Sequence, residues 1–260
     1  MAGLPVVDPR GRYVVLAGDW HGNIWWARGV VERAARAGVH MIWQLGDAAF
    51  RWPAEGGRFD RKVDKYLGDN DVELIWLDGN HDSHTRLRKL ECDDDGFAPL
   101  SERNRYAPRG LRFMANGRQV GVLGGAFSVD RDRRREGMTL WADLEEPTQE
   151  DIEQLGDDPL DVLLTHEAPT GVQLRSQLKL PDDVVARANN SRDLVRQAVE
   201  RTRPALLAHG HWHQRLTSEL IRADGGVTRV ESLAADDMPR DAVLLDLKTL
   251  HVGPLPKKMW

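Results

Sequence analysis

Metal-capable side chains follow five separate apolar runs of the sequence, within a few residues of the end of each run. They are Asp19 and His21 in AGDWHGN, Asp47 in QLGDAAF, Asn80 and His81 in LDGNHD, His166 in LLTHEAP, and His211 and His213 in HGHWH. Carboxylate, amide and imidazole groups together can bind divalent transition metals. Glycines recur at the ends of these runs; turn formation would explain the glycines, but it would not explain the histidines. The pattern therefore indicates a metal site built from five loops.

The apolar runs themselves have the length and residue types of β-strands. They are YVVLAG, HMIWQLG, VELIWLDG, RQVGVLGG, DVLLTH and ALLAHG, with TRVESL and AVLLDL late in the chain. Helical patterns lie between them: one ends at Gly38, one runs from Thr148 to Gly156, and one has Ser191 as a possible N-cap. Alternating strands and helices predict an α/β fold. Ligands bind beyond the carboxyl ends of strands in open α/β sheets, so the five loops can converge on one place.

Composition limits the class of protein. With 260 residues and 41% hydrophobic content, the chain can bury a sizeable core, and we expect a single domain over residues 1–260. The 36 basic and 41 acidic side chains are well mixed and give a net charge of −5, so we expect no stable nucleic-acid partner. No apolar stretch is long enough for a membrane span, no leader pattern is evident, and Cys92 is the one cysteine. These features predict a cytoplasmic protein with no membrane association.

In this order, the five blocks resemble the calcineurin-like metallophosphoesterase superfamily, whose pattern is D-x-H, G-D, G-N-H-[DE], H and G-H-x-H. The match spans residues 19–213, and an ordered set of five blocks is far more specific than any one of them. The resemblance implies a two-sheet α/β/β/α sandwich, in which TRVESL and AVLLDL would complete the second sheet. It also implies a metal-dependent phosphoric ester hydrolase.

The resemblance implies a role for each motif residue. Asp19, His21, Asp47 and His213 would bind one divalent ion, and Asp47, Asn80, His166 and His211 would bind a second. The expected ions are Mn²⁺, with Fe and Zn²⁺ as alternatives, because the ligands carry oxygen and nitrogen but no sulfur. A hydroxide bridging the ions would attack phosphorus, and the site would keep a charge of about +1, which suits an anionic phosphate. His81 would act as the general acid at the leaving oxygen, a structural turn histidine being the alternative.

The sequence departs from the family's phosphoprotein phosphatase branch, which has G-D-x-x-D-R-G. Phe50 occupies the position of the second aspartate, which orients the catalytic histidine in that branch. The change favours a small bacterial or phage-type phosphodiesterase acting on small phosphodiesters such as cyclic nucleotides. The alternatives are a phosphomonoesterase, a protein or nucleotide phosphatase of the same fold, or a non-catalytic binding module. Asp82 or Asp78 could replace the missing orienting aspartate, or either could be an exposed carboxylate.

Several residues outside the ligand set carry weaker predictions. Trp141 could contact a nucleobase, and Arg131 in VDRDRRREG could contact a substrate phosphate, a solvated loop being the alternative. If D-W-H and H-W-H are extended, Trp20 and Trp212 point away from the ligands and pack beneath the site, with base stacking as the alternative. Three further side chains have predicted places: His84 at the surface, with a substrate contact as the alternative, His209 in the core or behind the ligands, and Glu167 beside a ligand imidazole.

Overall fold

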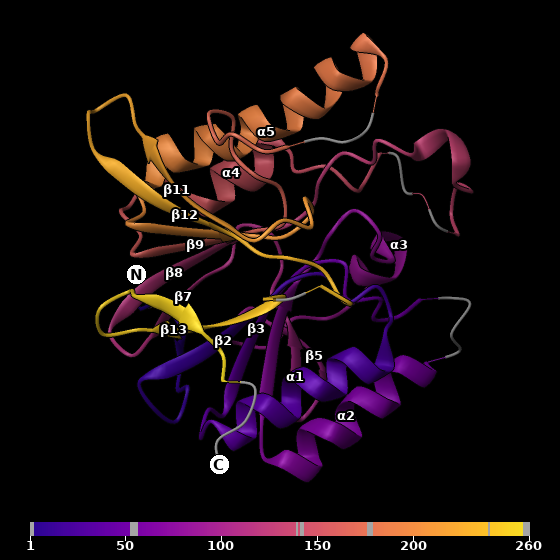
Figure 1. Cartoon of the computed structure of the whole chain (residues 1–260), viewed down its shortest axis with the longest axis vertical. Coiled ribbons are helices and arrows are strands. Elements are labelled where there is room, and N and C mark those ends of the chain that lie inside the picture. The colour runs from indigo at the N-terminus through magenta and orange to yellow at the C-terminus, as the bar shows by residue number, and fades with distance from the viewer. Residues whose placement is uncertain are drawn as a thin grey trace.

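The computed structural model describes residues 3–52, 57–138, 140, 143–175, 179–238 and 240–256. Two seven-stranded sheets pack face to face, and helices cover their outer faces (Figure 1). The α/β/β/α sandwich predicted from the sequence is therefore confirmed.

The first sheet carries three of the five motif strands. Its order is β14 (Val252–Pro254), β13 (Ala242–Asp246), β2 (Tyr13–Ala17), β3 (Met41–Leu45), β4 (Glu73–Leu77), β6 (Asn104–Tyr106) and β5 (Ala98–Ser101). Strands β2, β3, β4 and β6 run parallel, so their carboxyl ends share one edge. Helices α1 (Ile24–Arg36) and α2 (Arg58–Asn70) pack on its outer face.

The second sheet carries the other two motif strands. Its order is β1 (Val6–Val7), β7 (Arg112–Ala115), β8 (Arg118–Leu123), β9 (Val162–Thr165), β10 (Leu206–His209), β12 (Val227–Ser232) and β11 (Leu216–Ile221). Strands β8, β9, β10 and β12 run parallel, and α4 (Gln149–Leu155) and α5 (Asp182–Thr202) cover this sheet. The expectation that both late strands complete one sheet is wrong. TRVESL forms β12 here, whereas AVLLDL forms β13, which pairs antiparallel with β2 in the first sheet.

Both faces of the central strands are buried, which explains their continuous apolar sequences. In β2, Val14 and Leu16 belong to the core between the sheets. The alternating residues Val15 and Ala17 pack with α1 and α2 instead. A parallel strand that is covered on both faces needs apolar residues at nearly every position. The run YVVLA therefore forms a strand although polar and apolar residues do not alternate in it.

The helices agree with the sequence in two of three cases. Helix α1 ends just before Gly38, which has a φ of 69°, and α4 begins with the capping box of Thr148 and Asp151. Helix α5 contradicts the proposed N-cap at Ser191, because it begins at Asp182 and buries Ser191 in its middle. The acidic side chains of Asp182 and Asp183 in its first turn favour the earlier start.

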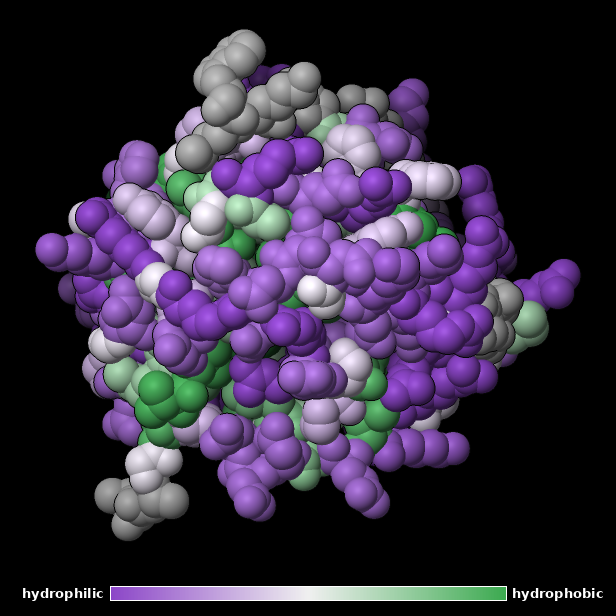
Figure 2. All heavy atoms as spheres, turned by 90° about the horizontal axis from the view of Figure 1, so that it is seen from below, coloured by the Kyte–Doolittle hydropathy of each residue, from purple (hydrophilic) through white to green (hydrophobic). Residues whose placement is uncertain are grey.

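Three helical segments were not predicted. Helix α2 buries few apolar side chains, the short α3 (His84–Leu87) follows the LDGNHD loop, and a 3₁₀ turn covers Arg131–Arg133. The face of the molecule over α1 and α2 is mainly hydrophilic, with small separate hydrophobic areas (Figure 2). Within the described ranges, no helix is both long and apolar enough to cross a bilayer.

Candidate metal centre

Loops from both sheets bring the motif side chains together at the carboxyl ends of their strands. Strands β2, β3 and β4 of the first sheet lead to Asp19, His21, Asp47 and Asn80, and β9 and β10 of the second lead to His166, His211 and His213. The predicted convergence of five loops is therefore present, and each sheet contributes to it.

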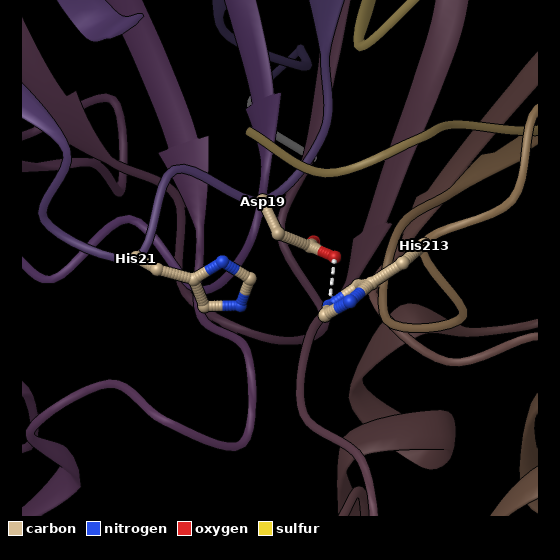
Figure 3. A group of neighbouring side chains, drawn as sticks. All are labelled: Asp19, His21 and His213. Atoms are coloured by element: carbon tan, nitrogen blue, oxygen red, sulfur yellow. Dashed lines mark ion pairs between the residues drawn. The ribbon is translucent and has the colours of Figure 1, made fainter. Parts of the chain in front are cut away.

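One group of side chains consists of Asp19, His21 and His213 (Figure 3). Potential ligand atoms of all three lie within 4.8 Å of one another. The Oδ2 atom of Asp19 is 3.1 Å from Nε2 of His213. His21 faces the same space from the other side, with its Nε2 atom 3.7 Å from Oδ2 of Asp47.

A second group adjoins the first through Asp47. The Nε2 atom of His166 is 3.0 Å from Oδ1 of Asn80 and 3.4 Å from Oδ2 of Asp47. The ring of His211 lies 5.1 Å from that of His166. The same carboxylate oxygen of Asp47 thus faces His21 in one group and His166 in the other.

The hydrogen bonds of the histidines match those of metal ligands. Nδ1 of His166 bonds the carbonyl of Leu45 at 2.7 Å, and Nδ1 of His21 bonds Asp236 at 2.8 Å. Both partners only accept, so each Nδ1 carries the proton and, in the neutral ring, each Nε2 carries a lone pair. These lone pairs face the oxygens of Asp47 and Asn80. Acceptors aimed at acceptors require a proton or a cation between them, and the oxygen and nitrogen donor set suits divalent ions.

The pKa values follow from the same arrangement. Burial would lower the pKa of His166, but the charge and hydrogen bond of Asp47 raise it to about 10. Burial likewise opposes a rise for His21, whose pKa Asp47 and Asp19 also bring to about 10. Burial would raise the pKa of Asp47, yet His166 and His81 hold it well below its ordinary value. Positive charge is therefore favoured around Asp47, whereas burial and the charge of His166 hold the pKa of His211 well below its ordinary value.

The loops that present these side chains have unusual backbone conformations. His21, Asp47, His211 and His213 all have φ between 45° and 65°. L-residues adopt this left-handed region rarely, and such strain clusters at functional sites. The D-W-H and H-W-H segments are therefore turns. The expectation that they are extended, with side chains that alternate between two sides, is wrong.

Two glycines permit the close approach of the loops. A Cβ atom on Gly79 would lie 2.2 Å from Oδ1 of Asp47, and one on Gly210 would lie 2.3 Å from Oδ1 of Asp19. Any larger residue would push these carboxylates out of the centre.

His81 borders the same centre without joining either group. Its side chain is 31% exposed, and its Nε2 atom is 4.0 Å from Oδ2 of Asp47. Its backbone N–H donates to Oδ1 of Asp47 at 2.7 Å, and Trp52 donates to its carbonyl at 2.9 Å. Burial lowers the pKa of His81; the negative charge of Asp47 opposes this shift and Arg134 adds to it. The imidazole is thus held in place by its backbone and left open on one side.

The two aspartates considered as orienting groups for His81 have other roles. Asp82 is buried and accepts backbone N–H groups of Asp47 and Ala49, both at 2.9 Å, and of Gly79 at 2.8 Å. Asp78 is buried too, and Arg109 donates to it at 2.6 Å. Neither is an exposed carboxylate, so that alternative is wrong for both. Asp82 ties together the loops after β3 and β4.

The other weaker predictions have mixed outcomes. His84 is 3% exposed and lies 3.6 Å from Asp78, so its predicted surface position is wrong. His209 is fully buried and bonds Ser232 at 2.7 Å, as expected for the core. Trp20 is also fully buried.

Glu167 and Trp212 lie together beside the centre. Glu167 is buried, which raises its pKa to about 7, and it accepts a hydrogen bond from Nε1 of Trp212 at 2.7 Å. Its other oxygen is 3.6 Å from Nε2 of His211, in line with its predicted place beside an imidazole. Trp212 is half-buried, contacts Arg192 through its ring, and lines a cavity instead of packing beneath the site.

The two predicted substrate contacts stay predictions. Trp141 lies outside the described residues. Arg131 pairs with Glu145 at 3.3 Å and lies over the ring of Phe127.

Sequence reasoning missed two groups that hold the candidate ligands. Asp236 follows β12 and bonds both His21 and Asn23, at 2.8 and 2.9 Å. Ser128 follows β8 and bonds Asn80 at 2.9 Å. Both come after carboxyl ends of parallel strands, so the rule that located the five motifs also covers these two loops.

A cavity of about 1270 Å³ opens from the centre. Its lining includes the motif residues Asp47, Asn80, His81, His211 and His213. Apolar side chains such as Leu174, Leu180, Val185, Ala188, Trp212 and Met238 line it as well, together with polar and charged ones such as Gln173, Arg175, Asn189, Arg192 and Gln214. An organic group attached to a phosphate at the centre would therefore meet both apolar and polar side chains.

Comparisons with known proteins agree with this fold and site. A family model described as calcineurin-like phosphoesterase matches residues 13–215, and the chain belongs to this family. The family makes the protein a metal-dependent phosphoesterase, a hydrolase, and implies a centre with two divalent ions.

Solved structures with similar folds cover nearly the whole chain. One is TT1561 of Thermus thermophilus, with 16% identity, a TM-score of 0.54 and coverage of 94% of this chain and 99% of that chain. Another is a dimetal phosphatase from Danio rerio, with 12% identity, a TM-score of 0.54 and coverage of 90% and 92%. At these identities the likeness concerns the fold. No curated protein matches the chain at a significant level.

Proposed function

We propose that the protein is a phosphodiesterase that hydrolyses small phosphodiesters such as cyclic nucleotides. One ion would be held by Asp19, His21, Asp47 and His213, and the other by Asp47, Asn80, His166 and His211. Mn²⁺ is the proposed metal at both positions, since it accepts mixed oxygen and imidazole ligands.

The position of Asp47 carries this proposal. Its Oδ2 atom lies 3.7 Å from Nε2 of His21, 3.4 Å from that of His166 and 4.0 Å from that of His81. A carboxylate shared between two groups of ligands is what a bridging ligand requires. A third imidazole at the same oxygen, outside both groups, is close enough to act on a phosphate bound there.

The chain's own residues have defined tasks in this reaction. When bound, two divalent ions supply a nucleophile from water near neutral pH and stabilise the charge that develops on the phosphate. His81 would donate a proton to the leaving oxygen, since its imidazole is open on one side and its backbone is fixed by Asp47. Asp82 keeps the loops of Asp47 and Gly79 in register, so that the ligands and His81 stay together.

The walls of the cavity support a diester over a monoester. A diester carries one negative charge and two organic groups, whereas a monoester carries close to two charges near neutral pH. Two of the lining arginines are already engaged: Arg192 bonds carbonyls of Pro169 and Val172, and Arg215 pairs with Glu231 at 2.7 Å. Of the three arginines that line the cavity, Arg215 is thus neutralised and Arg192 is held by carbonyls, which leaves Arg175 for a second negative charge, while apolar side chains form about half of the wall away from the motif residues.

The test starts from metal-free protein reloaded with Mn²⁺. Hydrolysis of a generic aryl phosphodiester, the matching monoester, and 2′,3′- and 3′,5′-cyclic nucleotides would be compared. We expect Mn²⁺-dependent turnover that favours the diesters. His81→Ala should lower kcat by about 10²- to 10⁴-fold, the usual contribution of general acid catalysis, with metal binding retained. His251→Ala, a change of an exposed histidine away from the motifs, is the matched control.

Two outcomes would contradict the proposal. Faster hydrolysis of the monoester would make the protein a phosphatase. Full activity of His81→Ala on the diester would remove His81 from the reaction.

A further inference from the structure

The side-chain amide of Asn80 has a defined orientation. Its Nδ2 atom donates to Oγ of Ser128 at 2.9 Å, and its Oδ1 atom faces Nε2 of His166 at 3.0 Å. The two ends of an amide have nearly the same shape but opposite hydrogen-bonding character, and only the oxygen can bind a metal ion. Something must therefore distinguish the two ends.

The hydroxyl group of Ser128 makes this distinction. Arg134 donates to its oxygen, and a guanidinium can only donate. The carboxylate of Glu145 adjoins this network: it accepts the backbone N–H of Ser128 at 3.3 Å and lies 3.9 Å from Arg134. The oxygen of Ser128 accepts from both Arg134 and Asn80, which engages its two lone pairs. An amide turned the other way would place its oxygen against one of these lone pairs and its NH₂ group toward His166.

Arg134 is committed to this network. Its side chain is 6% exposed. Besides Ser128, its guanidinium donates to the carbonyl of Asn80 at 3.4 Å and lies 3.6 Å from Asp130 and 3.9 Å from Glu145. A buried guanidinium with these partners is poorly placed to bind a substrate phosphate, so its role is in holding Asn80.

We propose that Ser128 and Arg134 are positioning residues that fix the Asn80 amide with its oxygen directed toward the ion shared with Asp47, His166 and His211. This inference rests on the ligand set of the proposed function. The loop after β8 thereby serves the centre without supplying a ligand. Outer residues that orient metal ligands commonly affect metal affinity by about 10- to 100-fold.

Metal titration of Ser128→Ala is the primary test. Calorimetric titration of metal-free protein with Mn²⁺ should give two equivalents for the native sequence. In Ser128→Ala one equivalent should bind about 10- to 100-fold more weakly, and the other should be unchanged. Arg134→Gln should weaken the same equivalent. Arg133→Gln, a change of the exposed arginine that precedes Arg134 and ends the 3₁₀ turn, is the matched control and should leave both unchanged.

Testing Ser128→Ala in a second protein, the Asn80→Asp variant, shows whether Ser128 orients the Asn80 amide or only packs against it. A carboxylate offers an oxygen at either end, so Asn80→Asp removes the need to choose an orientation. In the Asn80→Asp background, Ser128→Ala should weaken metal binding by less than about threefold. An equal loss in both backgrounds would mean that Ser128 acts through packing, and would overturn the proposal. Metal affinities are compared only between variants whose metal-free forms have equal stability, as measured by urea unfolding.

The stoichiometry distinguishes failure of this inference from failure of the proposed function. Fewer than two equivalents in the native protein would overturn both, because no second ion would need Asn80. If the native protein binds two equivalents and Ser128→Ala binds both with the native affinity, the positioning role alone is overturned.

Discussion

A methyl group added at Gly79 tests whether close contact between two loops builds the metal centre. The new Cβ atom would lie 2.2 Å from Oδ1 of Asp47, 2.4 Å from its backbone nitrogen and 2.7 Å from Cε1 of His166. Real Cβ atoms essentially never approach other atoms within 3.0 Å. Asp47 would have to retreat by at least 0.8 Å, the difference between 3.0 and 2.2 Å.

The surrounding hydrogen bonds resist that retreat. Asp82 accepts the backbone N–H groups of both Asp47 and Gly79, at 2.9 and 2.8 Å, so the two loops cannot separate without breaking one of them. Overpacking of this kind costs about 1–3 kcal/mol of stability. A misplacement near 1 Å costs a catalytic centre on the order of 100-fold in rate. For Gly79→Ala we therefore expect kcat/KM to fall about 100-fold and the metal-free protein to lose about 1–3 kcal/mol.

The assay combines urea unfolding of metal-free protein, Mn²⁺ titration and hydrolysis of an aryl phosphodiester. Gly29→Ala is the matched control: Gly29 lies on α1, and a Cβ there meets no atom within 4 Å. It should gain about 0.5–1 kcal/mol from helix propensity and keep its activity. If Gly79→Ala binds two ions with native affinity and keeps kcat/KM within twofold, the close approach does not place Asp47, and the reasoning is wrong.

Three further changes probe the surroundings of the site. Burial lowers the pKa of His84 from 6.5 to about 4, so between these pH values the unfolded chain binds a proton that the folded chain does not. The free energy of unfolding should therefore fall by about 3 kcal/mol as the pH drops from 6.5 to 4. In urea unfolding, His84→Asn should not show this loss of stability. Asn80→Asp adds a negative charge that cancels the site's surplus, so it should raise KM more than it weakens Mn²⁺ binding; an unchanged KM with lost metal would contradict this. Asp236→Asn should weaken one ion about 10- to 100-fold in calorimetry, because Asp236 orients His21.

The sequence predicted the strands that carry the site because those strands are buried on both faces. Runs such as YVVLA are apolar at consecutive positions because each face of the strand packs against a core. The metal-capable residues that follow show where each run ends. Helix α2 escaped prediction since it buries only Phe59, Val63 and Leu67 along one narrow stripe. The start of α5 was misplaced for a related reason, because the first part of that helix is largely exposed and its acidic first turn is the main signal of its beginning.

Contacts between loops were beyond sequence reasoning. His84 looked like a surface residue in a charged segment, but Asp78 and Arg109 form a buried pair beside it, and the imidazole completes that cluster. Asp236 reaches His21 from a distant part of the chain, as Ser128 reaches Asn80 from the loop after β8. Such pairs depend on how two sheets align, which no local pattern encodes.

The aspartates of the site also hold the loops that carry the histidines. The carboxylate of Asp19 accepts the backbone N–H of His211 at 3.0 Å, and that of Asp47 accepts the backbone N–H of His81 at 2.7 Å. The carbonyl of Asp47 accepts the backbone N–H of His21 at 2.8 Å. Left-handed conformations at His21 and His211 cost about 1–3 kcal/mol each, and these bonds help to offset that cost. Each aspartate therefore both faces the candidate ions and keeps a strained loop in place, so the centre is organised before any ion binds.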